Sequence, residues 1–145
     1  MGSTYRLSTL NKNKLSKLLT PIVFCYEEES IKHLLGEYES VSVNEVLSAK
    51  LLEINAKKRN LLVTDVLNDI INTLGESLLI KDFEILFDPE YQIDVLKYFV
   101  LMNRNKKVAV IWSGQHKNGK LIYAEPDYLD YKIYNIKDYD ISCII

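Results

Sequence analysis

The sequence lacks the features that would assign it to several large classes of protein. No apolar run approaches the ~20 residues that a membrane-spanning helix needs, and no apolar segment follows Arg6, so no signal peptide is predicted. The chain has only two cysteines, Cys25 and Cys143, and nothing in their spacing favours a disulfide. Cys25 lies in an apolar run, where a buried thiol is the usual role. We therefore expect a cytoplasmic protein without a membrane partner.

A strong excess of either charge is also absent. The net charge of -2 gives no general attraction to nucleic acid or to an anionic membrane. The two histidines, His33 and His116, have no cysteine or carboxylate at ligand spacing, so no metal site is expected. The chain does have ample apolar content, because 48% of its 145 residues are hydrophobic. We expect a single domain over residues 1–145.

Short apolar runs alternate with helical patterns along the chain. Strands are predicted at residues 22–26, 41–43, 77–87 (with the exit from the strand) and 108–112, and helices at residues 30–37, 45–54, 64–74 and 91–103. This alternation predicts an α/β fold with a mostly parallel sheet flanked by helices. Residues 22–26 form a continuous apolar run, which is typical of a strand buried on both faces, so we place this strand in the sheet interior.

Other signals predict where elements begin and end. Residues 1–20 predict a polar segment and a short helix that Pro21 terminates. Asn44 and Thr64 are candidate helix N-caps, and residues 57–59 predict a turn. Asn118-Gly119 is a strong hairpin signal, so residues 108–124 are predicted to form an antiparallel hairpin at the C-terminal edge of the sheet, with an edge strand at residues 141–145.

Several motifs after residue 42 resemble a known family. In chain order they are Val43-Asn44, Leu47-Ser48, Leu51-Leu52, Arg59, Phe83-Glu84-Ile85-Leu86-Phe87-Asp88-Pro89, Arg104-Asn105, Trp112-Ser113-Gly114, Tyr123-Ala124-Glu125-Pro126, Tyr131 and Tyr134. Together they resemble BrxF, the small P-loop-containing protein of type 3 BREX (bacteriophage exclusion) systems. The resemblance implies a P-loop NTPase-like fold and a role in a multi-protein bacterial defence system that distinguishes host DNA from phage DNA.

The phosphate-binding loop of that family is missing from its expected place. In such proteins the first strand leads into a Gly-rich loop that ends in Gly-Lys-Ser/Thr; its amides wrap the phosphates, its Lys neutralises charge and its hydroxyl holds Mg²⁺. Here the strand leads into Tyr26-Glu27-Glu28-Glu29-Ser30. Lys32 lies near the expected lysine but lacks the preceding Gly and a following Ser/Thr. Carboxylates at this position favour a helix N-terminus and repel a triphosphate, so the Walker A motif is degenerate.

The acidic residue that the family places on its third strand, on the Mg²⁺ side, is displaced as well. Aligned without a gap, that position is Lys81, and Asp82 is one step along, where a strand points its side chain to the opposite face. Asp82 could serve only if a bulge shifts the register. Glu84 is either a remnant catalytic carboxylate or one held by local hydrogen bonds, and Arg104 is either a phosphate-sensing arginine or an ion-pair residue. With Walker A and Walker B both degenerate, we expect no catalytic residue and no ATP or Mg²⁺ cofactor.

Aromatic residues gather near the C-terminus, with five tyrosines between Tyr123 and Tyr139. We predict a partner-binding surface formed by Trp112, Tyr123, Tyr128 and Tyr131, since Tyr and Trp are common interface anchors. Acidic residues lie among these tyrosines, so the surface is unsuited to stacking on nucleic-acid bases. The alternative is that Trp112 and Tyr123 fill the domain's own core.

Three functions remain open. The leading interpretation is a non-hydrolysing adaptor or regulatory subunit of a BREX complex, a pseudo-ATPase bound to other proteins of the same locus. The second is a weak nucleotide-binding ATPase of the same system. The third is a DNA-contacting subunit that uses basic clusters at residues 57–59 and 104–107, where solvated turns are the alternative.

Overall fold

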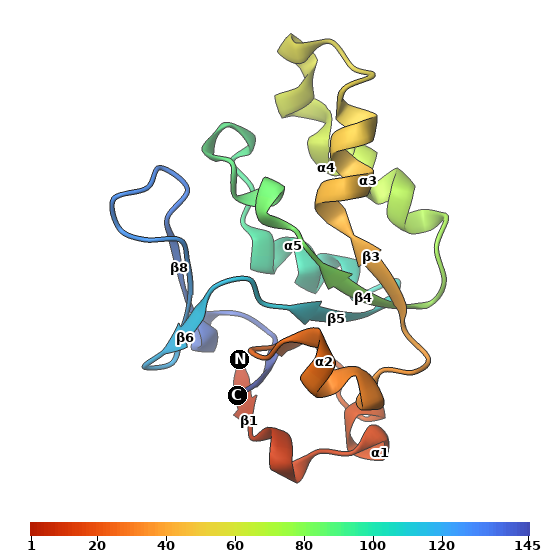
Figure 1. Cartoon of the computed structure of the whole chain (residues 1–145), viewed down its shortest axis with the longest axis vertical. Coiled ribbons are helices and arrows are strands. Elements are labelled where there is room, and N and C mark those ends of the chain that lie inside the picture. Colours follow the sequence, from red (N-terminus) through yellow and green to blue (C-terminus); the bar gives the residue numbers. More distant parts are fainter.

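The large sheet has six strands, each parallel to its neighbours (Figure 1). A computed structural model describes residues 1–145. In order across the sheet, the strands are β1 (Ser3–Tyr5), β9 (Ser142–Ile144), β2 (Ile22–Phe24), β5 (Lys107–Ile111), β4 (Ser77–Lys81) and β3 (Glu39–Ser42). The prediction of an α/β fold with a mostly parallel sheet is confirmed.

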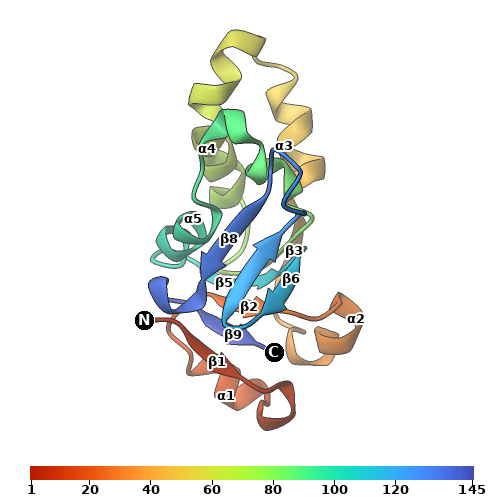
Figure 2. The same cartoon turned by 90° about the vertical axis from the view of Figure 1, so that its left-hand side faces the viewer.

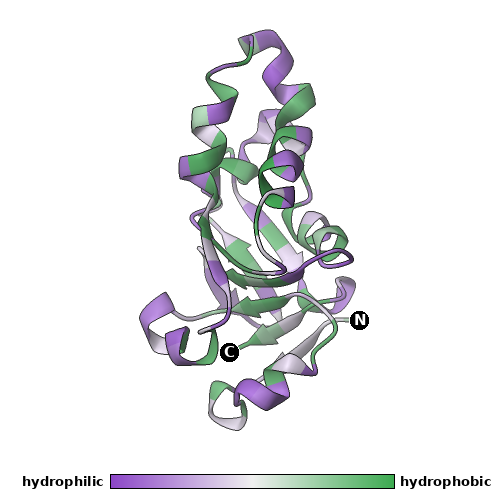
Figure 3. Ribbon diagram, turned by 90° about the vertical axis from the view of Figure 1, so that its right-hand side faces the viewer, coloured by the Kyte–Doolittle hydropathy of each residue, from purple (hydrophilic) through white to green (hydrophobic).

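Helices cover both faces of this sheet. Helices α1 (Lys12–Ser16) and α2 (Glu28–Ile31) pack on one face, while α3 (Val43–Leu51), α4 (Ala56–Asn72) and α5 (Val95–Met102) pack on the other. Along β2 the side chains alternate between the two layers, because Ile22 and Phe24 join the α1–α2 cluster and Val23 joins the α3–α5 cluster. Figure 3 shows the apolar central strands lying between more polar helices.

Strand β2 lies in the interior of the sheet, as its apolar run predicts. It pairs with β9 on one side and β5 on the other, and its three residues have no exposed surface. Strand β4 is the next strand after β5, so it is one strand removed from β2. The interior of the sheet therefore contains a fully buried strand, as expected for a parallel sheet that is covered on both faces.

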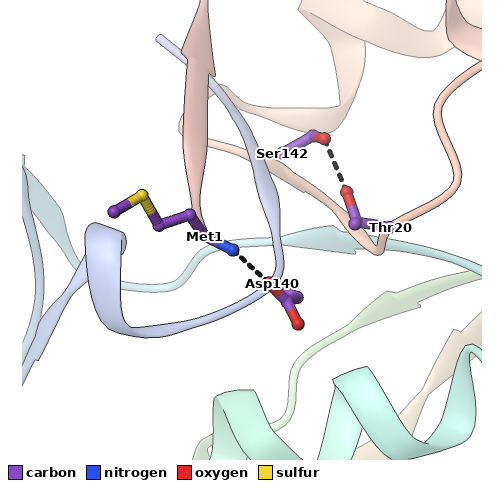
Figure 4. A network of polar contacts seen from close by, with 4 residues as sticks. All are labelled: Met1, Thr20, Asp140 and Ser142. Carbon is purple, nitrogen blue, oxygen red and sulfur yellow. Dashed lines mark hydrogen bonds and ion pairs between the residues drawn. The ribbon is translucent and has the colours of Figure 1, made fainter.

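The prediction of an edge strand at the C-terminus is wrong in its position. Strand β9 lies between β1 and β2, because residues 3–5 add the outermost strand. Side-chain contacts anchor this part of the sheet (Figure 4): the Met1 ammonium pairs with Asp140, and the hydroxyls of Thr20 and Ser142 are 2.7 Å apart. The polar sequence of β1 gives no strand signal, so residues 1–20 were not predicted to contain one.

A second sheet, antiparallel and three-stranded, packs beside the first (Figure 2). It contains β6 (Gln115–Lys117), β7 (Lys120–Tyr123) and β8 (Lys132–Asn135). The turn at Asn118-Gly119 is confirmed, with φ of 50° and 73° as a tight hairpin requires. However, the strand before the turn is β6, not residues 108–112, of which residues 108–111 belong to β5. Val108–Val110 are fully buried on both faces, an environment that a hairpin edge does not offer.

Several helix boundaries also differ from the predictions. Helix α4 begins at Ala56 rather than Thr64, so residues 57–59 form its first turn instead of a loop; its N-cap is Asn55, whose side chain accepts from the Lys57 amide at 3.0 Å. The helix predicted at residues 30–37 is shorter and continues as the 3-10 turn η2 (Lys32–Leu34). Helix α5 begins only at Val95, capped by Asp94.

The second sheet shares the larger hydrophobic core with the first. Trp112, Leu121 and Tyr134 belong to the same buried cluster as the residues of α3, α4 and α5. Two further 3-10 turns, η3 (Glu84–Phe87) and η4 (Pro89–Tyr91), connect β4 to α5, and η1 (Leu7–Thr9) and η5 (Ile136–Asp138) complete the elements. No helix is both long and apolar enough to cross a membrane.

Candidate functional site

The carboxyl end of the large sheet is the natural place to look for a site. In open parallel sheets, ligands bind outside the carboxyl ends of the strands, where the strand order reverses. That reversal occurs at β2, since the chain goes from β2 to β3 on one side and finally returns to β9 on the other. The segments at this end are residues 25–28 after β2, 82–84 after β4 and 112–114 after β5.

An ion pair joins the segment after β2 to the end of β4. The Lys81 ammonium, at the end of β4, lies 2.9 Å from a carboxylate oxygen of Glu28, in the first turn of α2. The two side chains keep 32% and 28% of their surface exposed. The hydrogen bond to Glu28 and the charge of that carboxylate both raise the pKa of Lys81. The segment after β2 thus carries the negative charge of this pair, and the end of β4 carries the positive charge.

Asp82 does not take the place of the missing acidic residue. The β3–β4 pairing runs without interruption to Ser42↔Lys81, so no bulge brings Asp82 into the strand. Asp82 follows the strand end in a left-handed conformation, with φ of 48°. Its carboxylate accepts a hydrogen bond from Ser42 Oγ at 3.0 Å, and its carbonyl accepts one from the Asn44 amide at 2.6 Å. Asp82 therefore joins β4 to the start of α3.

Asn44 holds Glu84 in place. Its Nδ2 donates to Glu84 Oε2 at 2.6 Å, and its Oδ1 accepts from the Ile85 amide at 2.9 Å. The predicted N-cap role of Asn44 is wrong, because α3 begins at Val43 and the cap position belongs to Ser42. The Glu84 carboxylate is thus held by a hydrogen bond from a residue distant in the chain.

The other two remnant candidates are not brought to this group. Lys32 is exposed in η2 and makes no side-chain hydrogen bond or ion pair. Arg104 lies between α5 and the start of β5, which is the opposite end of the sheet from Glu84. The four candidates Lys32, Asp82, Glu84 and Arg104 therefore do not form one site.

Three of the six basic side chains in the two clusters have structural partners. Arg59 Nε donates to the carbonyls of Leu51 and Ile54 at the end of α3, at 2.7 and 3.0 Å. Lys106 Nζ donates to the carbonyls of Leu74 and Gly75 after α4, and Lys107 Nζ donates to the Ser16 carbonyl of α1. Cations at helix C-termini satisfy unpaired carbonyls and the helix dipole. Arg59, Lys106 and Lys107 therefore act within the fold, while Lys57, Lys58 and Arg104 are exposed and make no side-chain hydrogen bond.

The four aromatic residues of the predicted partner surface have different environments. Trp112 is only 5% exposed; its ring packs edge-on against Phe87, and its Nε1 donates to the Ile122 carbonyl at 3.2 Å. Tyr123 is half-buried and stacks on Phe87 with 3.8 Å between ring centroids. Trp112 is thus a core residue, which was the stated alternative.

The remaining two aromatic residues lie on the loop between β7 and β8. Tyr128 is 62% exposed and Tyr131 is half-buried. Nearby, burial raises the pKa of Tyr123, and the charges of Asp130 and Glu84 raise it further. The exposed part of the predicted surface therefore begins at Tyr128, beside acidic groups.

Sequence reasoning missed one exposed residue of this region and one ion pair at the end of β4. Leu129, next to Tyr128, is 93% exposed, and its signal was an isolated apolar residue in a polar loop. The pairing of Lys81 with Glu28 had no local signal, because the two residues lie on separate elements. No protein-family model, curated protein or solved structure matches the chain.

Proposed function

We propose that this chain is a non-hydrolysing protein of P-loop NTPase-like fold that serves as an adaptor or regulatory subunit in a BREX-type bacterial anti-phage complex. The motifs that resemble BrxF support the defence role. The dry interior strand β2, followed at once by α2, supports the fold, since a P-loop joins a strand to a helix in this way.

The observation that carries the non-hydrolysing role is the Glu28–Lys81 ion pair. A phosphate cradle needs a lysine on the loop and a carboxylate on the strand that faces Mg²⁺. Here the strand that the resemblance equips with a carboxylate ends in Lys81, and the charge of Lys81 is neutralised by Glu28, a carboxylate in the segment after β2. Glu27 and Glu29 are further carboxylates beside the pair, at the position where a triphosphate would have to bind. Like charges at that point oppose phosphate binding.

Isothermal titration with ATP and Mg²⁺, together with an assay of phosphate release, tests this role. We expect neither tight binding nor hydrolysis by the wild-type protein. A matched variant, Glu28→Lys with Lys81→Glu, restores the family polarity of charge but not the glycine cradle. Binding gained only by this variant would identify the ion pair as the obstacle and support the proposal. Low-micromolar binding by the wild type would overturn it.

The adaptor role is tested by co-purification with the products of neighbouring genes. Tyr128→Ala and Tyr131→Ala change exposed and half-buried side chains of the β7–β8 loop, whereas Trp112→Ala changes the core. We expect Tyr128→Ala to stay folded and to lose a protein that the wild type retains. If no neighbouring gene product is retained by the wild type, the adaptor role is contradicted.

A further inference from the structure

A shallow groove of about 640 Å³ lies where the second sheet meets the segment after β4. One wall is the η3–η4 segment, and the other is the loop between β7 and β8 (Figure 2). We call it the β8 groove; it is lined by Glu84, Ile85, Asp88, Pro89, Tyr123, Tyr128, Leu129 and Asp130.

The groove combines apolar exposure with unpaired negative charge. Tyr128 and Leu129 are 62% and 93% exposed, so no other part of the chain covers them. Three lining residues are carboxylates, Glu84, Asp88 and Asp130, and no lining residue is a cation. None of the three forms an ion pair, since the only ion pairs in the chain are Lys81–Glu28 and the Met1 ammonium with Asp140. Glu84 accepts a hydrogen bond from Asn44 and Asp88 accepts one from the Glu90 amide, whereas Asp130 has no hydrogen-bond partner within the chain.

The chemistry of the groove narrows the class of ligand. Nucleic acid is repelled by the carboxylates. A metal ion does not fit, because no group of three His, Cys, Asp or Glu side chains is close enough to hold one. The carboxylates are too dispersed for a point charge, but they suit a ligand whose cationic groups are distributed along a chain. The exposed Tyr128 and Leu129 add a contact for an apolar side chain or for a guanidinium stacked on the tyrosine ring.

Left-handed backbone conformations occur beside the walls of the groove. Of the four non-glycine residues with positive φ, three adjoin the groove segments: Asp82 at 48°, Gln92 at 52° and Ala124 at 63°. The fourth, Asn118, is in the hairpin turn, where this conformation is favoured. Strained residues persist where the surrounding structure imposes them, and they gather at binding sites. Of these residues only Ala124 lies within a wall segment, where it fixes the start of the β7–β8 loop.

We propose that the β8 groove docks a basic peptide segment of a partner protein. Arginine or lysine side chains of that segment pair with Asp130, Asp88 and Glu84, and an apolar side chain packs on Tyr128 and Leu129. Opposite charge on the partner supplies orientation and register, while the apolar contact slows dissociation. This inference rests on the proposed adaptor function, to which it adds the chemistry of the partner.

Fluorescence anisotropy with defined peptides tests the proposal. The probe is a fluorescein-labelled peptide that alternates arginine with leucine, and its control carries glutamate in place of each arginine. The variant Asp130→Lys with Leu129→Ser alters two groove side chains that make no hydrogen bond within the chain. The matched control, Glu76→Lys, changes an exposed carboxylate at the amino end of β4, the opposite end of the sheet.

We expect the wild type and Glu76→Lys to bind the basic peptide and not the acidic one. The groove variant should bind at least about tenfold more weakly with an unchanged melting temperature, and raising the salt from about 50 to about 300 mM should weaken all binding. Equal binding by the groove variant, or no binding by the wild type, would overturn the proposal. The ATP titration tests the segment after β2, whereas the peptide assay tests the β8 groove. If the peptide does not bind and ATP does not bind either, the basic partner is contradicted and the non-hydrolysing role is not.

Discussion

Two acidic segments at the carboxyl end of the large sheet use their charges in opposite ways. After β2, Glu28 turns inward and pairs with Lys81 across two elements. In the loop between β7 and β8, Asp130 has no ion-pair partner and adjoins the exposed Leu129. The first segment is closed by the fold itself, and the second is left open. A paired charge serves the structure, whereas an unpaired charge beside exposed apolar surface is available to another molecule.

The largest effect should distinguish the core from the open loop. Trp112→Ala removes a ring packed against Phe83, Phe87 and Tyr134, and we expect it to lower the free energy of unfolding by about 3–5 kcal/mol. Tyr128→Ala, in the open loop, should change it by less than about 0.5 kcal/mol. Urea unfolding followed by circular dichroism measures both, since Trp112 is the only tryptophan and its fluorescence is lost in the variant. Similar losses in the two variants would show that the loop is part of the core.

The hydrogen bonds of Asn44 should also prove structural. Asn44→Ala leaves the half-buried Glu84 carboxylate and the Ile85 amide without their partner, which should cost about 1–3 kcal/mol. The matched control, Asn60→Ala, changes an exposed asparagine of α4 with no side-chain hydrogen bond, and it should be neutral or slightly stabilising. Chemical denaturation of both variants checks this. Equal stability of the two would mean that Glu84 is not held by the fold.

Alkaline pH should lower the stability of the protein, because three buried groups resist losing their protons in the folded state. Burial raises the pKa of Cys25 to about 11 and those of Cys143 and Tyr134 to about 12, from ordinary values of 9.0 and 10.0. The unfolded chain therefore loses these protons first, so the contribution is complete below about pH 9 and is lost as the pH rises towards about 12. Urea unfolding across this range should show the decline.

The variant Tyr134→Phe provides the control for this pH dependence. Its phenyl ring cannot ionise, so the wild type should lose stability relative to the variant between about pH 10 and 12, by up to about 1.4 kcal/mol per pH unit at most. A wild-type advantage that stays constant over this range would contradict the assigned burial of Tyr134.

The Glu28–Lys81 pair should contribute less, because it is partly solvated. Single charge reversals, Glu28→Lys and Lys81→Glu, should each destabilise the protein, and the double reversal should recover about 0.5–1 kcal/mol of coupling. High salt should reduce that coupling. A double-mutant cycle in urea measures this coupling. Zero coupling at low salt would contradict the claim that Glu28 serves the structure through its pairing with Lys81.

Two residues with left-handed backbone conformations should give effects of opposite sign, and the effect of Ala124→Gly is the smallest expected. Ala124, with φ of 63°, carries strain that Gly relieves, so Ala124→Gly should stabilise the protein by a few tenths of a kcal/mol after its entropic cost. Gly119→Ala, at φ of 73° with no neighbouring atom in the way, should destabilise it by about 1 kcal/mol. Thermal unfolding distinguishes the opposite signs. If Ala124→Gly is destabilising, the strain on that wall of the groove is not present.

The sequence predicted some elements of the fold well because their signals are local. The apolar run at residues 22–26 placed β2 inside the sheet, and Asn118-Gly119 placed the hairpin turn. The pairing of strands was predicted poorly, because it depends on contacts between distant residues that local signals do not specify. Residues 108–112 carry the same apolar run as β2 and join the parallel sheet, while the polar strand β6 takes their place in the hairpin.

For the candidate site, residue types were informative but their partners were not. The absence of glycine after β2 and the position of Asp82 next to Lys81 could be read from the sequence. That Arg104 lies at the other end of the sheet from Glu84, and that Asn44 binds Glu84 instead of capping α3, required the coordinates of elements far apart in the chain. Exposure of Tyr128 and burial of Trp112 likewise depend on which neighbours cover each ring.

The sequence by itself determined the alternation of strands and helices, the complete burial of β2 and the absence of glycine from residues 25–30. These follow from periodicity, composition and backbone preference, which act over a few neighbouring residues. Only the tertiary structure decided that β9 enters the sheet between β1 and β2, that Lys81 meets Glu28, and that three carboxylates and Leu129 share an open groove. Those contacts join residues distant in the chain, so no local pattern specifies them.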